Sequence, residues 1–228
     1  MRAGLTAAAL AIGLVACGPS SALPDREDSL RYVALGDSYT IGTSVSFAER
    51  WPNQLVARMP ELQLVANLGV NGYTSGDLID DELSALPALE PEFVTLLIGV
   101  NDVVQGVPEA AYAANVETIL DALLRLVAIN RVVCVATPDY TVTPQGAAFG
   151  PPAQQRAGIE RVNAILRDAC DRRGVRFVPE IFAISQDAAT DRSLVAGDGL
   201  HPSGAQYGLW VDAIQLAVEE LLLPSADR

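Results

Sequence analysis

The sequence predicts a three-layer α/β fold in which a five-stranded parallel sheet carries helices on both faces. Short apolar segments typical of buried strands alternate along the chain with longer segments whose apolar residues recur at helical spacing. The segment 93–98 is almost entirely apolar, as is expected of a parallel strand covered on both sides. Because βα units in one sheet connect by right-handed crossovers, the repeated pattern predicts a single parallel sheet. A chain of 228 residues, half of them hydrophobic, buries one sizeable core, which indicates one domain.

The predicted elements follow one another in regular order. We expect strands at 32–35, 62–66, 93–98, 131–136 and 175–178. We expect helices at 51–59, 75–86, 108–128 and 154–173, and a last helix that runs to about residue 223. Pro52 and Pro108 fit first helical turns, Gly174 fits a helix end, and Ser203 fits the N-cap of the last helix.

The segment 137–152 is the longest irregular stretch of the predicted domain. Its length of about 16 residues, with four prolines and two glycines, exceeds that of a usual connection between a strand and a helix. It follows the carboxyl end of a strand, which is the edge where open α/β sheets bind ligands. We therefore expect this segment to border the active site.

The amino-acid composition excludes several kinds of chemistry. All 15 basic residues are arginine, so Schiff-base formation, lysine general bases and the phosphate-binding P-loop are excluded. His201 is the one histidine, and any imidazole chemistry must depend on it. One histidine and three separated cysteines do not make a zinc site, and we expect neither a metal nor a cofactor. The net charge of -13 argues against nucleic acid as a partner.

The first residues have the features of an export signal. A single positive charge, Arg2, precedes an apolar run over residues 3–16 that is shorter than the about 20 apolar residues a membrane span needs. We therefore expect residues 1–16 to be a secretory signal peptide. Cleavage after Ala22, which ends a small-residue site, is one way in which such a signal is processed.

Cys17 favours a second mode of processing. Residues 14–17 resemble the lipobox of bacterial lipoproteins, in which a cysteine at the end of the apolar run is lipidated and becomes the N-terminus. The resemblance implies an acyl-chain anchor in the bacterial cell envelope, in the periplasm or at the cell surface. Residues 17–29, rich in serine, proline and charge, would then form a flexible tether to a folded domain at 30–228.

Four stretches with reactive or polar residues end apolar runs of the sequence, at 36–38, 67–72, 99–102 and 198–202. Because the carboxyl ends of parallel strands lie at a common edge, beyond which ligands bind, we expect these stretches to converge. Ser38 comes directly after the first strand and is the candidate nucleophile. A serine in such a position, taken alone, is more often the N-cap of a helix.

His201 is the candidate general base for Ser38. A serine hydroxyl attacks when a base removes its proton, and imidazole is the side chain that suits this task near neutrality. Asp198, three residues earlier, has the spacing to accept a hydrogen bond from the other ring nitrogen, which would fix the tautomer and stabilise the imidazolium. A structural histidine, and an aspartate that only forms the turn 197–199, are the alternatives.

The oxyanion that forms when an acyl carbonyl is attacked needs fixed hydrogen-bond donors. The candidate donors are the backbone N–H of Ser38, the backbone N–H of Gly72 and the side-chain amide of Asn101. A residue without Cβ lets the backbone approach a substrate, and this applies equally to Gly69 in the same stretch. Tight strand-to-helix turns are the alternative explanation for the glycines and the asparagine.

The chain resembles the SGNH, or GDSL, family of serine hydrolases in four ordered blocks, represented by Gly36-Asp37-Ser38, Gly72, Asn101 and His201. The resemblance extends over about residues 30–220. It implies a flavodoxin-like sheet and an esterase or lipase that hydrolyses esters or thioesters through an acyl-enzyme on Ser38. It also favours Gly72 over Gly69, because the family's second block runs from an asparagine, here Asn67, to the donor glycine five residues on.

Other polar and thiol residues are expected to be structural. Asp37 and Asp102 are given no catalytic role. Cys134 and Cys170 are expected to be buried thiols, with a disulfide between them as the alternative in an exported protein. A solvated helix face is predicted for four acidic residues, with cation binding as the alternative, namely Asp77, Asp80, Asp81 and Glu82.

The substrate class follows from the chemistry rather than from a motif. We expect an ester of a small molecule, a lipid or a glycan, with a short or medium acyl group. The candidates for an apolar acyl pocket, each equally explained by ordinary packing, are Tyr39, Ile41, Val103, Tyr140 and Phe149. Two other functions remain open, which are acyl transfer to an alcohol by the same site and ligand binding by a catalytically inactive surface lipoprotein.

Overall fold

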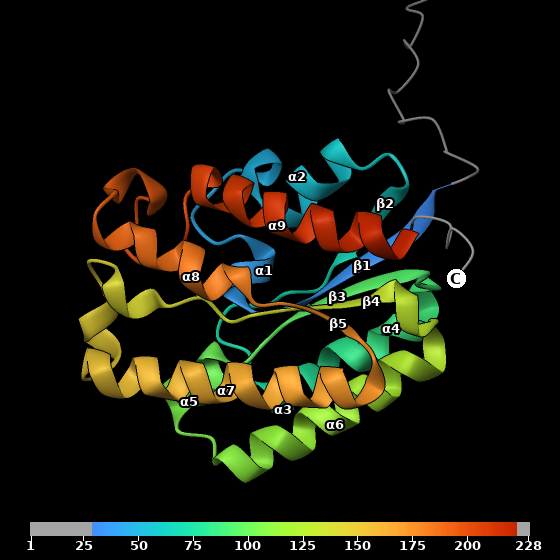
Figure 1. Cartoon of the computed structure of the whole chain (residues 1–228), viewed down its shortest axis with the longest axis horizontal. Helices are drawn as coiled ribbons and strands as arrows, with labels where there is room; N and C mark the ends of the chain where they lie inside the picture. The colour runs from blue at the N-terminus through green and yellow to red at the C-terminus, as the bar shows by residue number, and fades with distance from the viewer. Residues whose placement is uncertain (1–28, 223–228) are drawn as a thin grey trace, which may run out of the picture.

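A parallel sheet of five strands lies at the centre of the computed structural model, which describes residues 29–222 (Figure 1). The spatial order of the strands is β2-β1-β3-β4-β5, and all neighbouring pairs are parallel. All five predicted strands are present, with ends within two residues of those predicted, which confirms the α/β class. The strands are β1 (Leu30–Gly36), β2 (Leu62–Asn67), β3 (Phe93–Leu97), β4 (Val132–Val135) and β5 (Arg176–Val178).

Helices cover both faces of this sheet (Figure 1). Helices α1, α2, α8 and α9 lie over one face, and α3, α4, α6 and α7 lie over the other, while α5 packs against α7. The helices are α1 (Ser38–Ile41), α2 (Trp51–Arg58), α3 (Ser75–Asp77), α4 (Leu83–Leu89), α5 (Val100–Gln105), α6 (Glu109–Leu126), α7 (Pro152–Arg173), α8 (Glu180–Gln186) and α9 (Gly204–Leu222).

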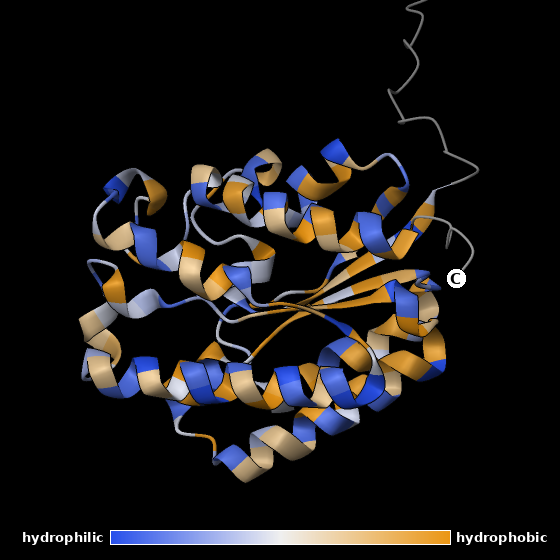
Figure 2. Cartoon of the chain, viewed as in Figure 1, coloured by the Kyte–Doolittle hydropathy of each residue, from blue (hydrophilic) through white to orange (hydrophobic). Residues whose placement is uncertain are grey.

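Alternate side chains of the central strands enter two separate cores. Tyr32 and Ala34 of β1 pack with residues of α2, α8 and α9, whereas Val33 and Leu35 pack with residues of α4, α6 and α7. Figure 2 shows strands that are mostly hydrophobic along their length, between helices of mixed hydropathy. This coverage on both faces explains why the central strands are unbroken apolar segments in the sequence.

The predicted helix 75–86 is interrupted in the structure. Helix α3 continues into a π-helical turn at Leu78–Glu82 before α4 begins. Leu78 and Leu86 are still buried in the same core, so the apolar spacing that predicted one helix is retained. The helix predicted from residue 108 begins at Glu109, because Pro108 has an extended ψ of 137° and is the N-cap residue.

Three short helices, α1, α5 and α8, were not predicted. Each follows the end of a strand closely, at the edge of the sheet where the polar stretches converge. They span only four, six and seven residues, which is too short for an apolar repeat to indicate a helix.

The two described cysteines are Cys134 of β4 and Cys170 of α7, and both are buried free thiols in contact with each other. The prediction of buried thiols is thus confirmed. In the part of the chain that the structure describes, no helix is long and apolar enough to cross a membrane. The predicted signal peptide at 1–16, the lipidation site at Cys17 and all but the last residue of the tether lie outside the described residues.

Candidate active site

Ser38 is the first residue of α1 and lies immediately beyond the end of β1. Gly36 allows the close approach that this turn requires, since its φ is 149° and a Cβ there would lie 2.2 Å from the Leu97 carbonyl oxygen. Asp37 is the N-cap of α1, and its Oδ1 accepts a hydrogen bond of 2.9 Å from the Tyr39 N–H, which is a structural role. The Ser38 N–H belongs to the first helical turn, where no intrahelical acceptor exists.

His201, the candidate base, contacts Asp198. The Nδ1 atom of His201 lies 2.6 Å from Oδ2 of Asp198. The other oxygen, Oδ1, accepts hydrogen bonds from the N–H groups of Leu200 (2.9 Å) and His201 (3.0 Å). The predicted turn and the predicted carboxylate–imidazole pair therefore coexist, because Asp198 forms the turn with one oxygen and holds the imidazole with the other.

Ser44 is a partner of Asp198 that the sequence analysis missed. Its hydroxyl donates a hydrogen bond of 2.7 Å to Oδ2, the same oxygen that contacts His201. Ser44 has a φ of 67°, a left-handed conformation that is uncommon for a residue with a side chain. The sequence carries no signal for this contact, since Ser44 and Asp198 are 154 positions apart.

Asp198 is held in its ionised form. Partial burial raises the pKa of this carboxyl, but hydrogen bonds from Ser44, from the His201 ring and from two backbone amides outweigh burial and place the pKa well below its ordinary value. The carboxylate is therefore charged throughout the neutral range. In that state it is able to stabilise a positive charge on the adjacent imidazole.

Gly72 presents its backbone to open space. Its φ is 84°, and a Cβ built on it would find no atom within 4 Å. Within residues 29–222 its N–H donates to no other group, whereas the Gly69 N–H donates to the Asn67 side chain at 3.1 Å. A Cβ on Gly69 would lie 2.7 Å from the Ile41 nitrogen, so that glycine is required for packing. These contacts favour Gly72 over Gly69 as a donor to a ligand.

Asn101 lies on α5, just beyond the end of β3. Its amide Nδ2 donates a hydrogen bond of 2.9 Å to the Tyr73 carbonyl, which leaves one amide hydrogen for a ligand. Gln105 of the same helix donates to the Gly72 carbonyl at 2.8 Å. Helix α5 therefore fixes the segment that carries Gly72 relative to Asn101.

Ser38, Asn101 and His201 line one small cavity of about 40 Å³. Asp198 and Gly72 are not part of its lining. The prediction that the segment 137–152 borders the site agrees with the lining, to which this segment contributes two aromatic rings. The other lining residues are mostly apolar, namely Tyr39, Val100, Val104, Tyr140, Phe149 and Leu200.

Two of the five apolar candidates for an acyl pocket lie elsewhere. Ile41 does not line the cavity. Val103 packs against Gly158 of α7, where a Cβ would lie 2.5 Å from its Cγ1. Val103 therefore serves packing, which was the alternative explanation.

The Ser38 hydroxyl forms no hydrogen bond with His201 in the described part of the chain, although both side chains line the same cavity. The Tyr39 ring lies against the imidazole, with centroids 5.3 Å apart. In free enzymes the hydrogen bond between nucleophile and base is often long, and it shortens when substrate binds. The structure thus brings Ser38, Asn101 and His201 to one cavity without a hydrogen bond between Ser38 and His201.

Residues 34–209 match the sequence profile of the GDSL-like lipase/acylhydrolase family. The chain belongs to this family. An arylesterase from Vibrio mimicus is 27% identical over 99 residues, which are 42% of this chain and 49% of that protein, so the match spans about half of the relative's length.

Solved structures of an acetylxylan esterase and of a lipase/acylhydrolase share the fold of this GDSL-like chain. An acetylxylan esterase from Geobacillus stearothermophilus superposes with a TM-score of 0.66 at 19% identity, covering 83% of this chain and 94% of its own. A lipase/acylhydrolase from Enterococcus faecalis gives a TM-score of 0.66 at 20% identity, with coverage of 87% and 100%. The α/β architecture is therefore that of known hydrolases of this kind.

The prediction of a solvated acidic face was wrong for Glu82. Asp77, Asp80 and Asp81 are exposed, but Glu82 is 3% exposed, because it lies on the same side of the helix as Leu78 and Leu86. Its Oε2 accepts a hydrogen bond of 2.9 Å from the Gly36 N–H. Burial raises the pKa of Glu82 to about 9, so it carries a proton at neutral pH.

Two further carboxyls lie buried near the nucleophile. Burial raises the pKa of Asp37 to about 7, and the charge of Asp102 adds to this rise. Asp102 accepts hydrogen bonds from the Ser75 N–H and hydroxyl, which is the structural role expected of it. Across residues 29–222 no three His, Cys, Asp or Glu side chains are grouped so as to hold a metal ion.

Proposed function

We propose that this protein is a serine hydrolase that cleaves carboxylic esters, and thioesters, through an acyl-enzyme on Ser38. The observation that carries the proposal is the convergence of the Ser38 hydroxyl, the Asn101 amide and the His201 imidazole on one cavity. Asp198 orients the imidazole from behind. Membership of the GDSL-like family and the esterase names of its relatives support ester hydrolysis.

In the first half-reaction His201 acts as general base. Asp198 engages Nδ1, so Nε2 takes the proton of Ser38 as the serine oxygen attacks the acyl carbon. The carbonyl oxygen becomes an oxyanion, for which the donors are the N–H groups of Ser38 and Gly72 and the Asn101 amide. The bond between the acyl carbon and the alcohol oxygen then breaks, and the alcohol leaves with the proton from His201.

In the second half-reaction water replaces the alcohol. His201 removes a proton from water as the water oxygen attacks the acyl-enzyme. When the ester bond to Ser38 breaks, the same proton returns to the serine and the carboxylic acid is released. Asp198 stays ionised throughout, because its pKa lies well below neutrality, and it stabilises the imidazolium in both steps.

Names of the relatives support a substrate class of small-molecule or glycan esters. One relative is an arylesterase, and one structural neighbour is an acetylxylan esterase. We infer that this chain acts on esters of the same general kind. Its net charge of -13 favours neutral substrates over polyanionic ones.

Labelling of the full chain with a fluorophosphonate, read by intact-mass spectrometry, tests the assignment of Ser38. We expect one adduct on the native chain and none on Ser38→Ala. We also expect Ser38→Ala to lower kcat for p-nitrophenyl acetate at least about a thousandfold. Ser84→Ala, which removes an exposed hydroxyl on α4, is the matched control and keeps both adduct and activity. A folded native chain that takes no adduct would contradict the proposal and favour a ligand-binding protein.

We also propose that the chain is exported and anchored in the bacterial cell envelope by lipidation of Cys17. The support is the sequence of residues 1–17, with Arg2, the apolar run and the cysteine at its end. Mass spectrometry of protein extracted from membranes of an expressing bacterium is expected to show loss of residues 1–16 and acyl mass on Cys17. The Cys17→Ser variant is expected to be absent from the membrane fraction. A native chain that carries no acyl group and begins after Ala22 would contradict the proposal.

A further inference from the structure

The cavity beside Ser38 is small compared with a long acyl chain. Its volume is about 40 Å³, which is enough for a few water-sized groups next to the serine oxygen. An acetyl or propionyl group fits beside Ser38, whereas the far carbons of an octanoyl group lie beyond this volume, where Phe149 forms part of the lining.

The chemistry indicates which walls face the acyl group. His201 gives its proton to the departing alcohol, so the alcohol must lie next to the imidazole. The acyl group then extends toward the remaining walls, which come from α5 through Val104 and from the segment 137–152 through Tyr140 and Phe149. These walls determine how long an acyl group the site accepts.

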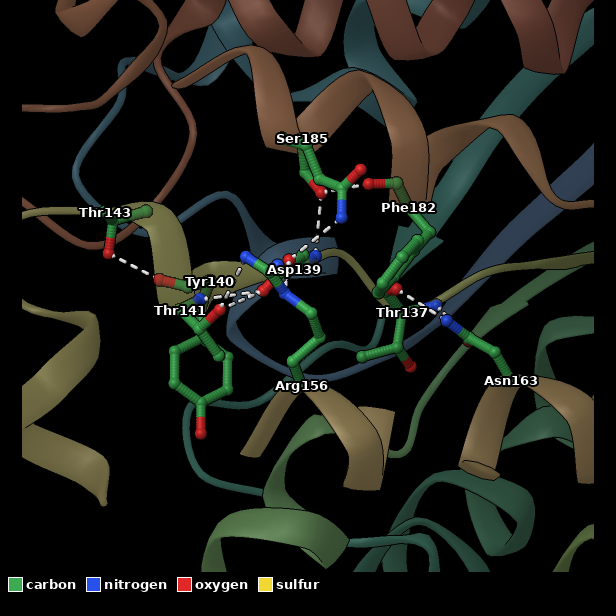
Figure 3. Close-up of polar contacts among 10 residues, drawn as sticks. Thr137, Asp139, Tyr140, Thr141, Thr143, Arg156, Asn163, Phe182 and Ser185 are labelled. Atoms are coloured by element: carbon green, nitrogen blue, oxygen red, sulfur yellow. Dashed lines mark hydrogen bonds and ion pairs between the residues drawn. The ribbon is translucent and has the colours of Figure 1, made fainter. Parts of the chain in front are cut away.

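A buried polar cluster fixes the backbone beside Tyr140 (Figure 3). Asp139 is fully buried, and its Oδ1 accepts a hydrogen bond of 3.0 Å from the Thr141 N–H. Its Oδ2 pairs with Nε of Arg156 on α7 at 2.7 Å, and its N–H donates to the Ser185 hydroxyl on α8 at 2.7 Å. The start of the segment is thus attached to helices on both faces of the sheet.

Tyr140 in turn supports Phe149. The Tyr140 hydroxyl donates a hydrogen bond of 2.6 Å to the Gln155 side chain, and the ring is 3% exposed. Phe149 meets this ring edge-on, with centroids 5.6 Å apart and an interplanar angle of 77°. Gly146 closes the turn between them, since a Cβ there would lie 2.4 Å from the Tyr140 carbonyl oxygen.

Phe149 differs from the other lining residues in its exposure. Its side chain is 39% exposed, whereas the other residues around the cavity are buried or half-buried. This large apolar ring, which Tyr140 supports, therefore lies between the buried part of the cavity and solvent. We propose that Phe149 determines the acyl specificity of this site and restricts it to esters of acyl groups with two or three carbons, an inference that rests on the proposed function.

The test compares kcat/KM for p-nitrophenyl acetate and p-nitrophenyl octanoate. In the native chain we expect octanoate to be at least about a hundredfold poorer, because each methylene in a hydrophobic pocket changes kcat/KM by about tenfold or more. Phe149→Ala is expected to raise the octanoate-to-acetate ratio at least about tenfold. Phe47→Ala, which removes another exposed phenylalanine (69% exposed) outside the cavity, is the matched control and leaves the ratio unchanged.

Fluorophosphonate titration of each variant separates the two levels of the proposal. A native chain that is labelled at Ser38 but prefers octanoate would overturn the inference on Phe149 and leave the hydrolase in place. The same conclusion follows if Phe149→Ala is fully labelled and its ratio changes by less than about twofold. A native chain without an adduct on Ser38 would overturn both.

Discussion

Asp198 and Glu82 are two carboxyls in the region of the candidate nucleophile, and their environments are opposite. The Asp198 side chain is 30% exposed and accepts hydrogen bonds from Ser44, from the His201 ring and from two backbone N–H groups. Glu82 is 3% exposed and, among the described residues, accepts a hydrogen bond from the Gly36 N–H alone. The pKa of Asp198 is well below its ordinary value, and that of Glu82 is raised to about 9. The balance of donors against burial decides which carboxyl is charged.

The difference assigns the two carboxyls to different tasks. The charged Asp198 contacts His201, on which a positive charge would develop in the proposed mechanism. Glu82 attaches to Gly36, two residues before Ser38, as a neutral acid. A neutral group there fixes the end of β1 without placing a negative charge near the developing oxyanion.

Removal of a hydrogen-bond donor from Asp198 is expected to have a larger effect on activity than a change at Glu82. Ser44→Ala removes the hydroxyl that donates a hydrogen bond to Asp198. A hydrogen bond to a charged group contributes about 1.5 kcal/mol, so we expect its loss to lower kcat/KM by about tenfold. Steady-state kinetics with p-nitrophenyl acetate measure this change.

Ser44→Gly distinguishes the effect of losing the hydroxyl from the effect of strain in the backbone at this position. Glycine adopts a φ of 67° without strain, so we expect Ser44→Gly to lose as much activity as Ser44→Ala while its Tm is the higher of the two. If both variants keep the native kcat/KM, the hydroxyl plays no part in positioning Asp198.

Removal of the titratable group of Glu82 is expected to change the stability of the fold rather than its activity. Between pH 7 and 9 folded Glu82 keeps a proton that the unfolded chain releases, because its pKa is about 9 when folded and ordinary when unfolded. The folded state thus binds more protons, and the free energy of unfolding falls as pH rises. Asp37, with a pKa of about 7, contributes mainly below this window.

Glu82→Gln keeps an oxygen for the Gly36 N–H and removes the ionisation. We expect the Tm of the native chain to fall by at least about 3 °C from pH 7 to 9, which corresponds to about 1 kcal/mol for a chain of this size. The Tm of Glu82→Gln is expected to fall much less over the same pH range. Differential scanning fluorimetry across the pH series measures it. Asp81→Asn, at an exposed neighbour, is the control, and parallel curves for the native chain and Glu82→Gln would refute the assignment.

Local sequence information was sufficient for the sheet and for part of the site. The central strands were predicted because they are covered on both faces and are therefore mostly apolar, as β3 and β4 are. Asp198 and His201 were predicted as a pair because three residues of one turn set their geometry. Ser38 was placed correctly at a strand end, since the edge of a parallel sheet collects such residues.

Long-range packing determined what the sequence did not predict. The Ser44 contact depends on a loop from the first quarter of the chain lying against the turn before α9. Glu82 reads as part of an acidic cluster, but its burial depends on which side of the helix faces β1. Ile41 and Val103 have apolar side chains that would suit a pocket wall. Only the tertiary structure shows that they do not line the cavity.

The chain order of the site also has a consequence during synthesis. The residues that form the nucleophile turn leave the ribosome early, whereas His201 and Asp198 precede α9, close to the carboxyl end of the described fold. A nascent chain that ends before residue 198 therefore has a serine without a base and cannot hydrolyse an ester by the proposed mechanism. By the proposed mechanism, hydrolysis requires the turn that carries Asp198 and His201 to lie beside Ser38, so activity reports that the first and last parts of the domain have joined.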